Sequence, residues 1–386
     1  MTKSHLGAYM TKPLTGTLVV SLDQAVAAPL TARRLADAGA RVIKLERPEG
    51  DFARYYDDVV RGQCTHFVWL NRGKESVIAD LGKPGDRRLF EALVAKADVL
   101  LQNLKPGALA RLGYPIETLR AQYPRLVCCS ISGYGDDGPY RDRKAYDLLV
   151  QAESGLASIT GGPEAPARVG VSVVDIATGM HAYEAILEAL IARGRTGRGA
   201  DIRVSMFDSM MEWMAIAMLY AEHGAPQKRS GLTHPTLAPY GVFQTADAAP
   251  ILISIQNDRE WVVLCKEVLN RPDLARDPRF ATSPARTANR ADTDGAVARY
   301  FSTRPVELLS RELEAAQIAF ARVNAVDDIL QHPHLRRVPV GSPWGDFAVP
   351  ASPSRFAGEP EPTYGPLPSL GQHTERVRRE FLGPAG

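Results

Sequence analysis

Short apolar runs alternate with helix-like segments from the start of the chain, and this alternation constrains the fold more than any other feature. Residues 18–22 and 41–45 are apolar runs typical of buried strands. Between them, Leu30 and Leu35 fall on one helical stripe, and Gly39 stands where a helix C-cap belongs. A strand, a helix and a strand in close succession predict a right-handed unit with parallel strands.

The same alternation continues through the first half of the chain. Helices are predicted at 87–96, 116–122 and 180–193, and strands at 99–102 and 125–131. This order of elements predicts an α/β fold, with a doubly wound, mostly parallel, Rossmann-like sheet in a large domain.

The pattern changes after Asp208, where an apolar helix is followed by a turn-rich stretch and short strands. We therefore predict a large α/β domain at 1–205, a linker helix at 206–224, a smaller α+β domain at 225–316, and a C-terminal segment at 317–386 that returns to the large domain.

The composition argues against several classes of protein. Lys and Arg number 46, Asp and Glu number 44, and no long run has one sign, so we expect no nucleic-acid partner. The N-terminus has no apolar stretch of signal-peptide length, and either Met1 or Met10 can be the natural start. Residues 210–221 are too short to cross a membrane and are predicted to form a buried helix.

The cysteines form no Cys-x-x-Cys pair, and Cys128 and Cys129 should point to opposite faces of a strand. We therefore expect reduced thiols in a cytoplasmic protein.

Three common catalytic patterns are missing from the sequence. Residues 23–29, at the first strand-to-helix turn, lack the Gly-x-Gly-x-x-Gly cradle of a dinucleotide site. His332 and His334 are a close histidine pair without a cysteine or a convincing carboxylate set nearby, so we expect no metal. No Gly-x-Ser-x-Gly elbow is present either. We therefore expect no permanently bound cofactor.

Several short segments, taken together in their order and spacing, resemble the class III CoA-transferase family of the CaiB/BaiF type, to which formyl-CoA transferase and carnitine CoA-transferase belong. The resemblance runs from residue 13 nearly to the C-terminus. The matching segments are GARVIKLER at 39–47, NRGKES at 71–76, ADVLLQNLKPGAL at 97–109, KAYD at 144–147, DIATGMH at 175–181, TGRG at 196–199, APYGVF at 238–243, DPRF at 277–280 and LGQHT at 370–374.

The resemblance implies a covalent mechanism on one of two carboxylates. Asp175 matches the family's catalytic Asp, whereas Asp147 falls where members carry an acidic residue beside CoA. Asp175 is then expected to attack the donor thioester and to carry CoA as an aspartyl thioester. This requires an ionised Asp, which the reference pKa of about 3.9 supplies at neutral pH.

Each proposed catalytic residue also has a structural alternative. Asp175 is equally suited to cap the helix that continues through 180–193, where backbone N–H groups would keep it ionised. Asp147 either contacts CoA or caps a helix before Leu148. By resemblance, the Gln24 amide donates a hydrogen bond to an acyl or anhydride oxygen, and the alternative is a turn-stabilising amide. Tyr146 stands where the related acyl-CoA racemases have a His, which favours transfer over racemisation.

The resemblance also assigns residues to CoA as a substrate. Side chains are expected to bind its phosphates and adenine, and backbone segments should run along the nucleotide, while Gly82 replaces a family Lys. Asn71 and Lys74 can equally organise a turn. The predicted CoA-binding residues are Arg47, Ala79, Gly82, Asn103, Leu104, Lys105, Arg111, Lys144 and Asp147.

The expected reaction moves CoA from a donor, by resemblance succinyl-CoA, to a dicarboxylate such as malate, mesaconate or itaconate. Formyl or oxalate specificity is disfavoured because residues 225–258 contain no run of glycines. The resemblance further implies an interlocked homodimer. The alternatives are an acyl-CoA racemase or isomerase that uses the same pocket, and a noncatalytic acyl-CoA-binding protein.

Overall fold

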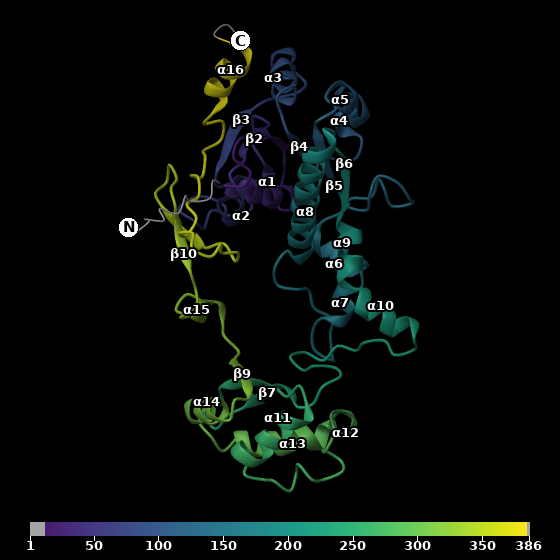
Figure 1. The fold of residues 1–386 in the computed structure, drawn as a ribbon, viewed down its shortest axis with the longest axis vertical. Helices are drawn as coiled ribbons and strands as arrows, with labels where there is room; N and C mark the ends of the chain where they lie inside the picture. The colour runs from purple at the N-terminus through teal and green to yellow at the C-terminus, as the bar shows by residue number, and fades with distance from the viewer. Residues whose placement is uncertain (1–11, 384–386) are drawn as a thin grey trace, which may run out of the picture. The chain divides into compact units, whose positions relative to one another are not determined.

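The computed structural model describes residues 12–383, which form two compact units (Figure 1). The first unit contains the chain up to Leu156, then Val169–Ala215 and the segment from Arg336 onward. The second unit contains Ala157–Arg168 and Ile216–Leu335. The question of Met1 against Met10 lies outside the described residues.

A six-stranded parallel sheet forms the centre of the first unit, which confirms the predicted α/β class. Its strand order is β3-β2-β1-β4-β5-β6, so the direction of winding reverses between β1 and β4. The strands are β1 (Leu18–Leu22), β2 (Arg41–Glu46), β3 (Lys74–Ile78), β4 (Val99–Gln102), β5 (Val127–Ser132) and β6 (Asp201–Ser205). Open sheets of this kind bind ligands beyond the carboxyl ends of their strands, at the point where the order reverses.

Helices cover both faces of this sheet because successive strand residues point to opposite sides. Cys128 packs in one core and Cys129 in the other, as predicted. One face is covered by α1 (Ala27–Asp37) and α8 (Val173–Thr196), and the other by α3 (Pro84–Val94), α5 (Ile116–Gln122) and α16 (Thr374–Leu382). The late helix α16 thus lies beside the early elements α3 and β3 (Figure 1).

Shorter elements complete the first unit. They are η1 (Phe52–Tyr55), α2 (Thr65–Leu70), α4 (Ala108–Arg111), α6 (Asp147–Glu153), α9 (Met206–Trp213), β10 (Arg337–Val340) and β11 (Phe347–Pro350); α7 (Leu156–Ile159) begins at the boundary between the units.

The second unit has its own antiparallel sheet and its own core around Trp261 and Phe301. Its strands are β7 (Tyr240–Gln244), β8 (Pro250–Ser254) and β9 (Ala319–Arg322). Its helices are α10 (Ala215–Glu222), which begins at the boundary, α11 (Asp258–Val263), η2 (Leu264–Val268), α12 (Ser283–Ala288), α13 (Arg290–Phe301), α14 (Val306–Ala315) and α15 (Val326–Ile329).

The apolar stretch 210–221 differs from its prediction as one buried helix. Met210 in α9 is fully buried, but Ile216 and Leu219 in α10 are 66% and 56% exposed. The prediction is wrong for α10 because an apolar sequence indicates a preference for burial without specifying a partner surface. No helix within residues 12–383 has the length and apolar character needed to span a bilayer.

Candidate active site

Gln24 and Asn103 meet at the point where the order of the sheet reverses. Gln24 follows β1 and Asn103 follows β4, and the two residues are joined by two hydrogen bonds. The Gln24 backbone N–H donates to Asn103 Oδ1 at 2.9 Å, and Asn103 Nδ2 donates to the Gln24 carbonyl at 2.9 Å. Within the described chain, the half-buried Gln24 side-chain amide makes no hydrogen bond of its own. That amide is therefore free to bind a ligand.

The first turn of α8 brings Asp175 and Asp147 together. The helix begins at Val173 with Ser172 as its N-cap, so Asp175 lies inside the first turn. Asp147 Oδ1 accepts hydrogen bonds from the backbone N–H groups of Val174 (2.8 Å) and Asp175 (3.2 Å). Asp147, not Asp175, therefore satisfies the helix N-terminus, and the prediction of Asp175 as the N-cap is wrong.

The Asp175 carboxylate has an unfavourable electrostatic environment. Burial, and then the negative charge of Asp147, raise the pKa of Asp175 to about 7. Among the described residues, no cation or hydrogen-bond donor pairs with this carboxylate. The expectation of a fully ionised Asp175 at neutral pH took the ordinary pKa of an Asp, and burial and the charge of Asp147 raise the pKa above that value.

Close packing of α1 on α8 places the Gln24 turn beside Asp175. A Cβ atom at Gly179 would lie 2.7 Å from the Ala27 carbonyl oxygen, so only glycine permits this approach. One turn earlier on α8, Ile176 packs against the cluster of Val26, Leu30 and Leu70, against which Ala25 also packs. The residue after Asp175 and the residue after Gln24 thus pack against one buried cluster, so both proposed catalytic groups lie in one region of the first unit.

Two tyrosines lie near the same carboxylate. Burial raises the pKa of Tyr56, and the charges of Asp51 and Asp175 and the neighbouring Tyr146 raise it further. Tyr146 is the N-cap of α6 and is 60% exposed, directly before Asp147. The Tyr146 side chain is therefore exposed at the start of α6, beside Asp147.

The residues predicted to bind CoA fall into two groups. Arg47, Lys105, Arg111 and Lys144 are exposed cations, and Arg111 Nη1 lies 3.4 Å from the Pro106 carbonyl. Three backbone amides in the predicted nucleotide segments already have acceptors: those of Ala79 (Glu46 O, 2.8 Å), Gly82 (Asp80 Oδ1, 3.0 Å) and Leu104 (Gln102 Oε1, 2.7 Å). These amides are therefore not free to bind phosphate, and of the two groups only the exposed cations have charge available for an anion.

A cavity of about 240 Å³ lies beyond the carboxyl ends of β4 and β5. It brings together Leu104 and Lys105 of the predicted set with Arg141, which sequence reasoning missed, but it does not include Arg47 or Asp175. The cavity and the Asp175 region are thus separate features of the same sheet edge.

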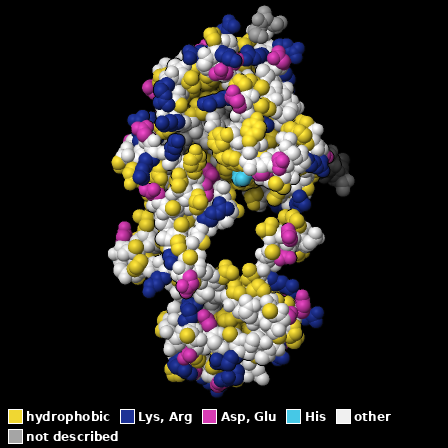
Figure 2. Space-filling model, turned by 180° about the vertical axis from the view of Figure 1, so that it is seen from behind, with side chains coloured by type: hydrophobic (Ala, Val, Ile, Leu, Met, Phe, Trp, Pro, Cys, Tyr) yellow, Lys and Arg dark blue, Asp and Glu magenta, His cyan; other side chains and the backbone are white. Residues whose placement is uncertain are grey.

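No extended basic surface appears on the face drawn in Figure 2, where basic side chains are interspersed with acidic and apolar ones.

His332 and His334, the predicted histidine pair, lie with ring centroids 6.0 Å apart. A different group, Asp57, Cys64 and His66, brings potential metal-ligand atoms within 4.8 Å of one another. The Asp57 oxygens there accept hydrogen bonds from the backbone and the hydroxyl of Thr65, which explains the cluster as the start of α2.

Comparison with known proteins agrees with this geometry. The model of CoA-transferase family III matches residues 14–374. Acetyl-CoA:oxalate CoA-transferase of Acetobacter aceti is 37% identical and succinate–glutarate CoA-transferase of Agrobacterium fabrum is 34% identical, each over 96% of both chains. The crystal structure of a CAIB/BAIF family protein from Brucella suis superposes with a TM-score of 0.82 at 35% identity, and the match covers 96% of this chain and all of that one. This chain therefore belongs to CoA-transferase family III.

Proposed function

We propose that this enzyme transfers CoA from an acyl-CoA donor to a dicarboxylic acid through a thioester on Asp175. The observation that carries the proposal is the Asp175 carboxylate itself, which is largely buried, has no compensating cation and lies beside the turn that carries a free Gln24 amide. A carboxylate placed in this way is destabilised as an anion, and forming a neutral covalent adduct relieves that penalty.

Four balanced steps make up the proposed reaction. The Asp175 carboxylate attacks the donor thioester carbonyl, forming a mixed anhydride and releasing CoA thiolate. The thiolate attacks the aspartyl carbonyl, which leaves aspartyl-CoA and the free donor acid. The acceptor carboxylate then attacks aspartyl-CoA to give a second anhydride and thiolate. Finally the thiolate attacks the acceptor carbonyl, producing the new acyl-CoA and restoring Asp175.

Gln24 acts on the charge that develops in these steps. Each attack puts negative charge on a carbonyl oxygen, and an oriented amide N–H stabilises that charge without reorganising. The main chain of Gln24 is fixed by Asn103 while its side chain is free, so the donor is available at a defined place.

Succinyl-CoA is the donor we favour, with a dicarboxylate such as malate, mesaconate or itaconate as acceptor. The two curated relatives reported above are named for oxalate and glutarate, which are also dicarboxylates. Oxalate should therefore be assayed as an acceptor together with malate, mesaconate and itaconate, although the glycine run associated with formyl-CoA transferases is missing from residues 225–258. The interlocked homodimer, the cytoplasmic location and the domain division at 1–205, 206–224, 225–316 and 317–386 remain predictions.

Intact-protein mass spectrometry after incubation with succinyl-CoA or acetyl-CoA tests the assignment. We expect the wild-type chain to gain the mass of CoA less water, Asp147→Asn to keep this adduct, and Asp175→Asn to lose it. An adduct that persists in Asp175→Asn and disappears in Asp147→Asn would move the nucleophile to Asp147. No adduct in any of the chains would favour a noncatalytic binding protein.

CoA binding and transfer should separate in Asp175→Ala. We expect turnover to fall by at least about a thousandfold, because the covalent route is removed. The CoA dissociation constant, measured by calorimetry, should stay within about threefold because the predicted phosphate contacts lie elsewhere. A collapse of CoA binding would instead assign Asp175 a structural role. Rapid exchange of the substrate α-proton in deuterated water, without transfer, would favour the racemase alternative.

A further inference from the structure

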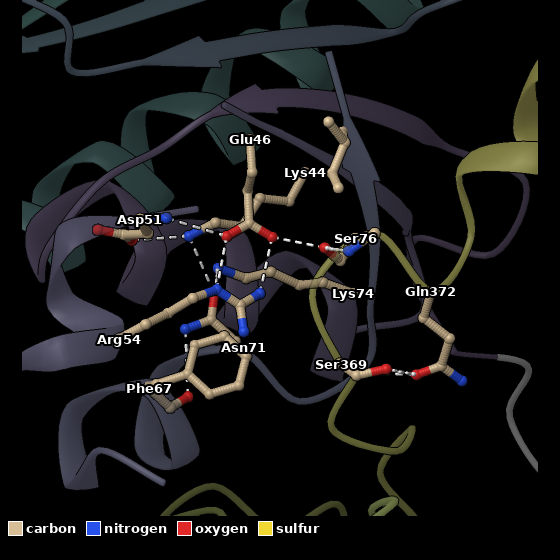
Figure 3. Close-up of polar contacts among 12 residues, drawn as sticks. Lys44, Glu46, Asp51, Arg54, Phe67, Asn71, Lys74, Ser76, Ser369 and Gln372 are labelled. Carbon is tan, nitrogen blue, oxygen red and sulfur yellow. Dashed lines mark hydrogen bonds and ion pairs between the residues drawn. The ribbon is translucent and has the colours of Figure 1, made fainter. Parts of the chain in front are cut away.

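Two of the sequence segments that carry the family resemblance have no part in the reaction described above. They are residues 71–76 and 370–374, which lie far apart in the chain but meet at the edge strand β3. Their polar side chains continue into a buried network that includes Lys44, Glu46 and Asp51, several members of which are labelled in Figure 3. This network ends at the turn that carries Gln24.

The centre of the network consists of two buried carboxylates and two buried ammonium groups. Lys44 Nζ lies 2.7 Å from Asp23 Oδ1 and 2.8 Å from Asp51 Oδ2, and Lys74 Nζ lies 2.9 Å from Asp23 Oδ2. Asn71 Oδ1 accepts from both ammonium groups, at 3.3 and 3.0 Å. The four charged side chains are at most 2% exposed and carry no net charge, so the cluster is paired throughout.

Asp51 connects this cluster to the Gln24 turn. Its carboxylate accepts the backbone N–H of Ala25 at 3.1 and 3.2 Å and that of Ala53 at 3.0 Å. Ala25 has a φ of 60°, a left-handed conformation that residues with a side chain seldom adopt. The conformation at Ala25 therefore depends on its surroundings, and the charged acceptor on its N–H is the contact that holds it.

An outer layer holds Asp51 in turn. Glu46 Oε1 accepts the Asp51 backbone N–H at 3.2 Å, and the same carboxylate binds Arg54 through two hydrogen bonds of 2.8 Å. Figure 3 shows Glu46 between Arg54 and Ser76, whose hydroxyl donates at 2.5 Å. Ser76 Oγ also accepts the backbone N–H of Gly371 at 2.9 Å. The C-terminal segment is thus linked to the turn before α1 through three residues, Ser76, Glu46 and Asp51.

We propose that Asp51 is a positioning residue for Gln24, and that it acts by holding the Ala25 backbone while Asn103 holds the Gln24 backbone from the other side. The inference rests on the proposed function, because it assumes that the Gln24 amide acts on the acyl group carried by Asp175. Lys44 and Lys74 keep the carboxylates of this cluster paired, and residues 71–76 and 370–374 keep the cluster closed.

This arrangement is better explained by positioning than by stability alone. Well-packed apolar residues can replace buried ion pairs with little loss of stability, so stability does not by itself account for four buried charges. The need for a charged acceptor at the left-handed backbone of Ala25 does account for these four charges. Such an acceptor fixes the residue next to Gln24, and in an active site an error of about 1 Å lowers the catalytic rate roughly a hundredfold.

The test compares Asp51→Asn with Gln24→Ala and with the double variant, using single-turnover formation of the Asp175–CoA adduct from succinyl-CoA and from acetyl-CoA. We expect Asp51→Asn to slow the maximal rate by about 10- to 100-fold. The donor concentration at half-maximal rate should stay within twofold. In the Gln24→Ala background, the same substitution should add less than about threefold, because residues that act through one group are not additive.

Asp37→Asn is the matched control. Asp37, like Asp51, is a carboxylate paired with a cation: it accepts two hydrogen bonds from the Arg72 guanidinium, at 3.0 and 2.7 Å, but it lies at the other end of α1 from Gln24. The Asp37→Asn variant should keep a maximal rate within twofold of the wild-type rate. Lys74→Met is a second variant in case Asp51→Asn does not fold, and we expect it to show the same dependence on Gln24 with a smaller loss of rate.

The two proposals fail in different ways. If the wild-type chain forms no adduct on Asp175, the proposed function is wrong. If the adduct forms but the losses in Asp51→Asn and Gln24→Ala multiply fully, Asp51 does not act through Gln24 and the positioning role is wrong. A rate in Asp51→Asn equal to that of the wild-type chain overturns the inference as well.

Discussion

Asp23 and Asp175 are both acidic side chains in the first unit, yet their surroundings are opposite. Asp23 is completely buried, and although burial opposes its charge, Lys44 and Lys74 hold its pKa well below the ordinary range. Asp175 is less buried, but it has no cation, and burial together with Asp147 raises its pKa to about 7. Within one domain, one carboxylate is thus fully compensated and the other is left without compensation.

On this difference we base the proposal that Asp23 is a structural acid and Asp175 the reactive one. Two ammonium groups stabilise the anion of the Asp23 carboxylate, so its attack on a thioester would lose that stabilisation. A carboxylate that is partly desolvated, beside a second negative charge, is destabilised in its ground state and gains from acylation. The two sites should therefore respond oppositely to substitutions that remove charge.

The largest effect on stability is expected at the compensated site. Lys44→Met removes the ammonium group that binds both Asp23 and Asp51, and Lys74 then pairs with Asp23 alone. The free energy of unfolding should therefore fall by about 3–5 kcal/mol. Urea denaturation followed by circular dichroism measures this loss. Lys266→Met, at an exposed pair with Glu267, should leave the denaturation curve unchanged. If the denaturation curve of Lys44→Met also matched that of the wild-type chain, the cluster would tolerate an unpaired charge.

A smaller effect of opposite sign is expected at the uncompensated site. An unfolded Asp loses its proton near pH 4, whereas folded Asp175 keeps it to about pH 7, so the folded chain loses stability as the pH rises between about 4 and 7. The neutral side chain of Asp175→Asn avoids this penalty. At about pH 8 the variant should gain about 1–3 kcal/mol in unfolding free energy, and at about pH 5.5 it should gain less. An equal gain at both pH values would contradict the assigned ionisation.

The smallest effect concerns the interaction between Asp175 and Asp147. The attacking form of Asp175 is the anion, so adduct formation should rise with pH through a midpoint near 7. Asp147→Asn removes the like charge but keeps an oxygen for the α8 N–H groups, and it should lower this midpoint by up to about one unit. Glu153→Gln, in the same helix α6 and paired with Arg143 at 3.0 Å, serves as the control. An unchanged midpoint in Asp147→Asn would leave burial alone as the cause of the raised pKa.

The sequence predicts the elements whose signals are local. Strand β4 and helix α5 lie at the predicted residues, because apolar periodicity alone defines them. Strand β3 was not predicted, because its first residues, Lys74, Glu75 and Ser76, are polar and show no apolar run. In the fold these side chains form hydrogen bonds with Asp23, Arg41 and Glu46. The start of α8 was likewise misplaced, because its capping group comes from Asp147, in another helix.

The candidate site divides in the same way. Gln24 and Asp175 were assigned from the family resemblance and remain predictions, and the close approach of α1 to α8 places them in one region. The ionisation of Asp175 was not predictable, because both causes of its raised pKa arise from tertiary packing. Asp51 was also not predicted, although Lys44, inside the apolar segment 41–45, was a signal that a buried carboxylate lies nearby.

The contact between Gly371 and Ser76 has a consequence for the order of biosynthesis. The ribosome synthesises all six strands of the parallel sheet before it reaches residue 371. Until the segment before α16 has emerged, the outer edge of β3 therefore lacks the partner that covers it in the folded chain. Such an edge readily pairs with foreign strands. Removal of residues 369–383 should thus yield a chain that aggregates during translation, and chaperone occupancy on stalled ribosomes would report how long this exposure lasts.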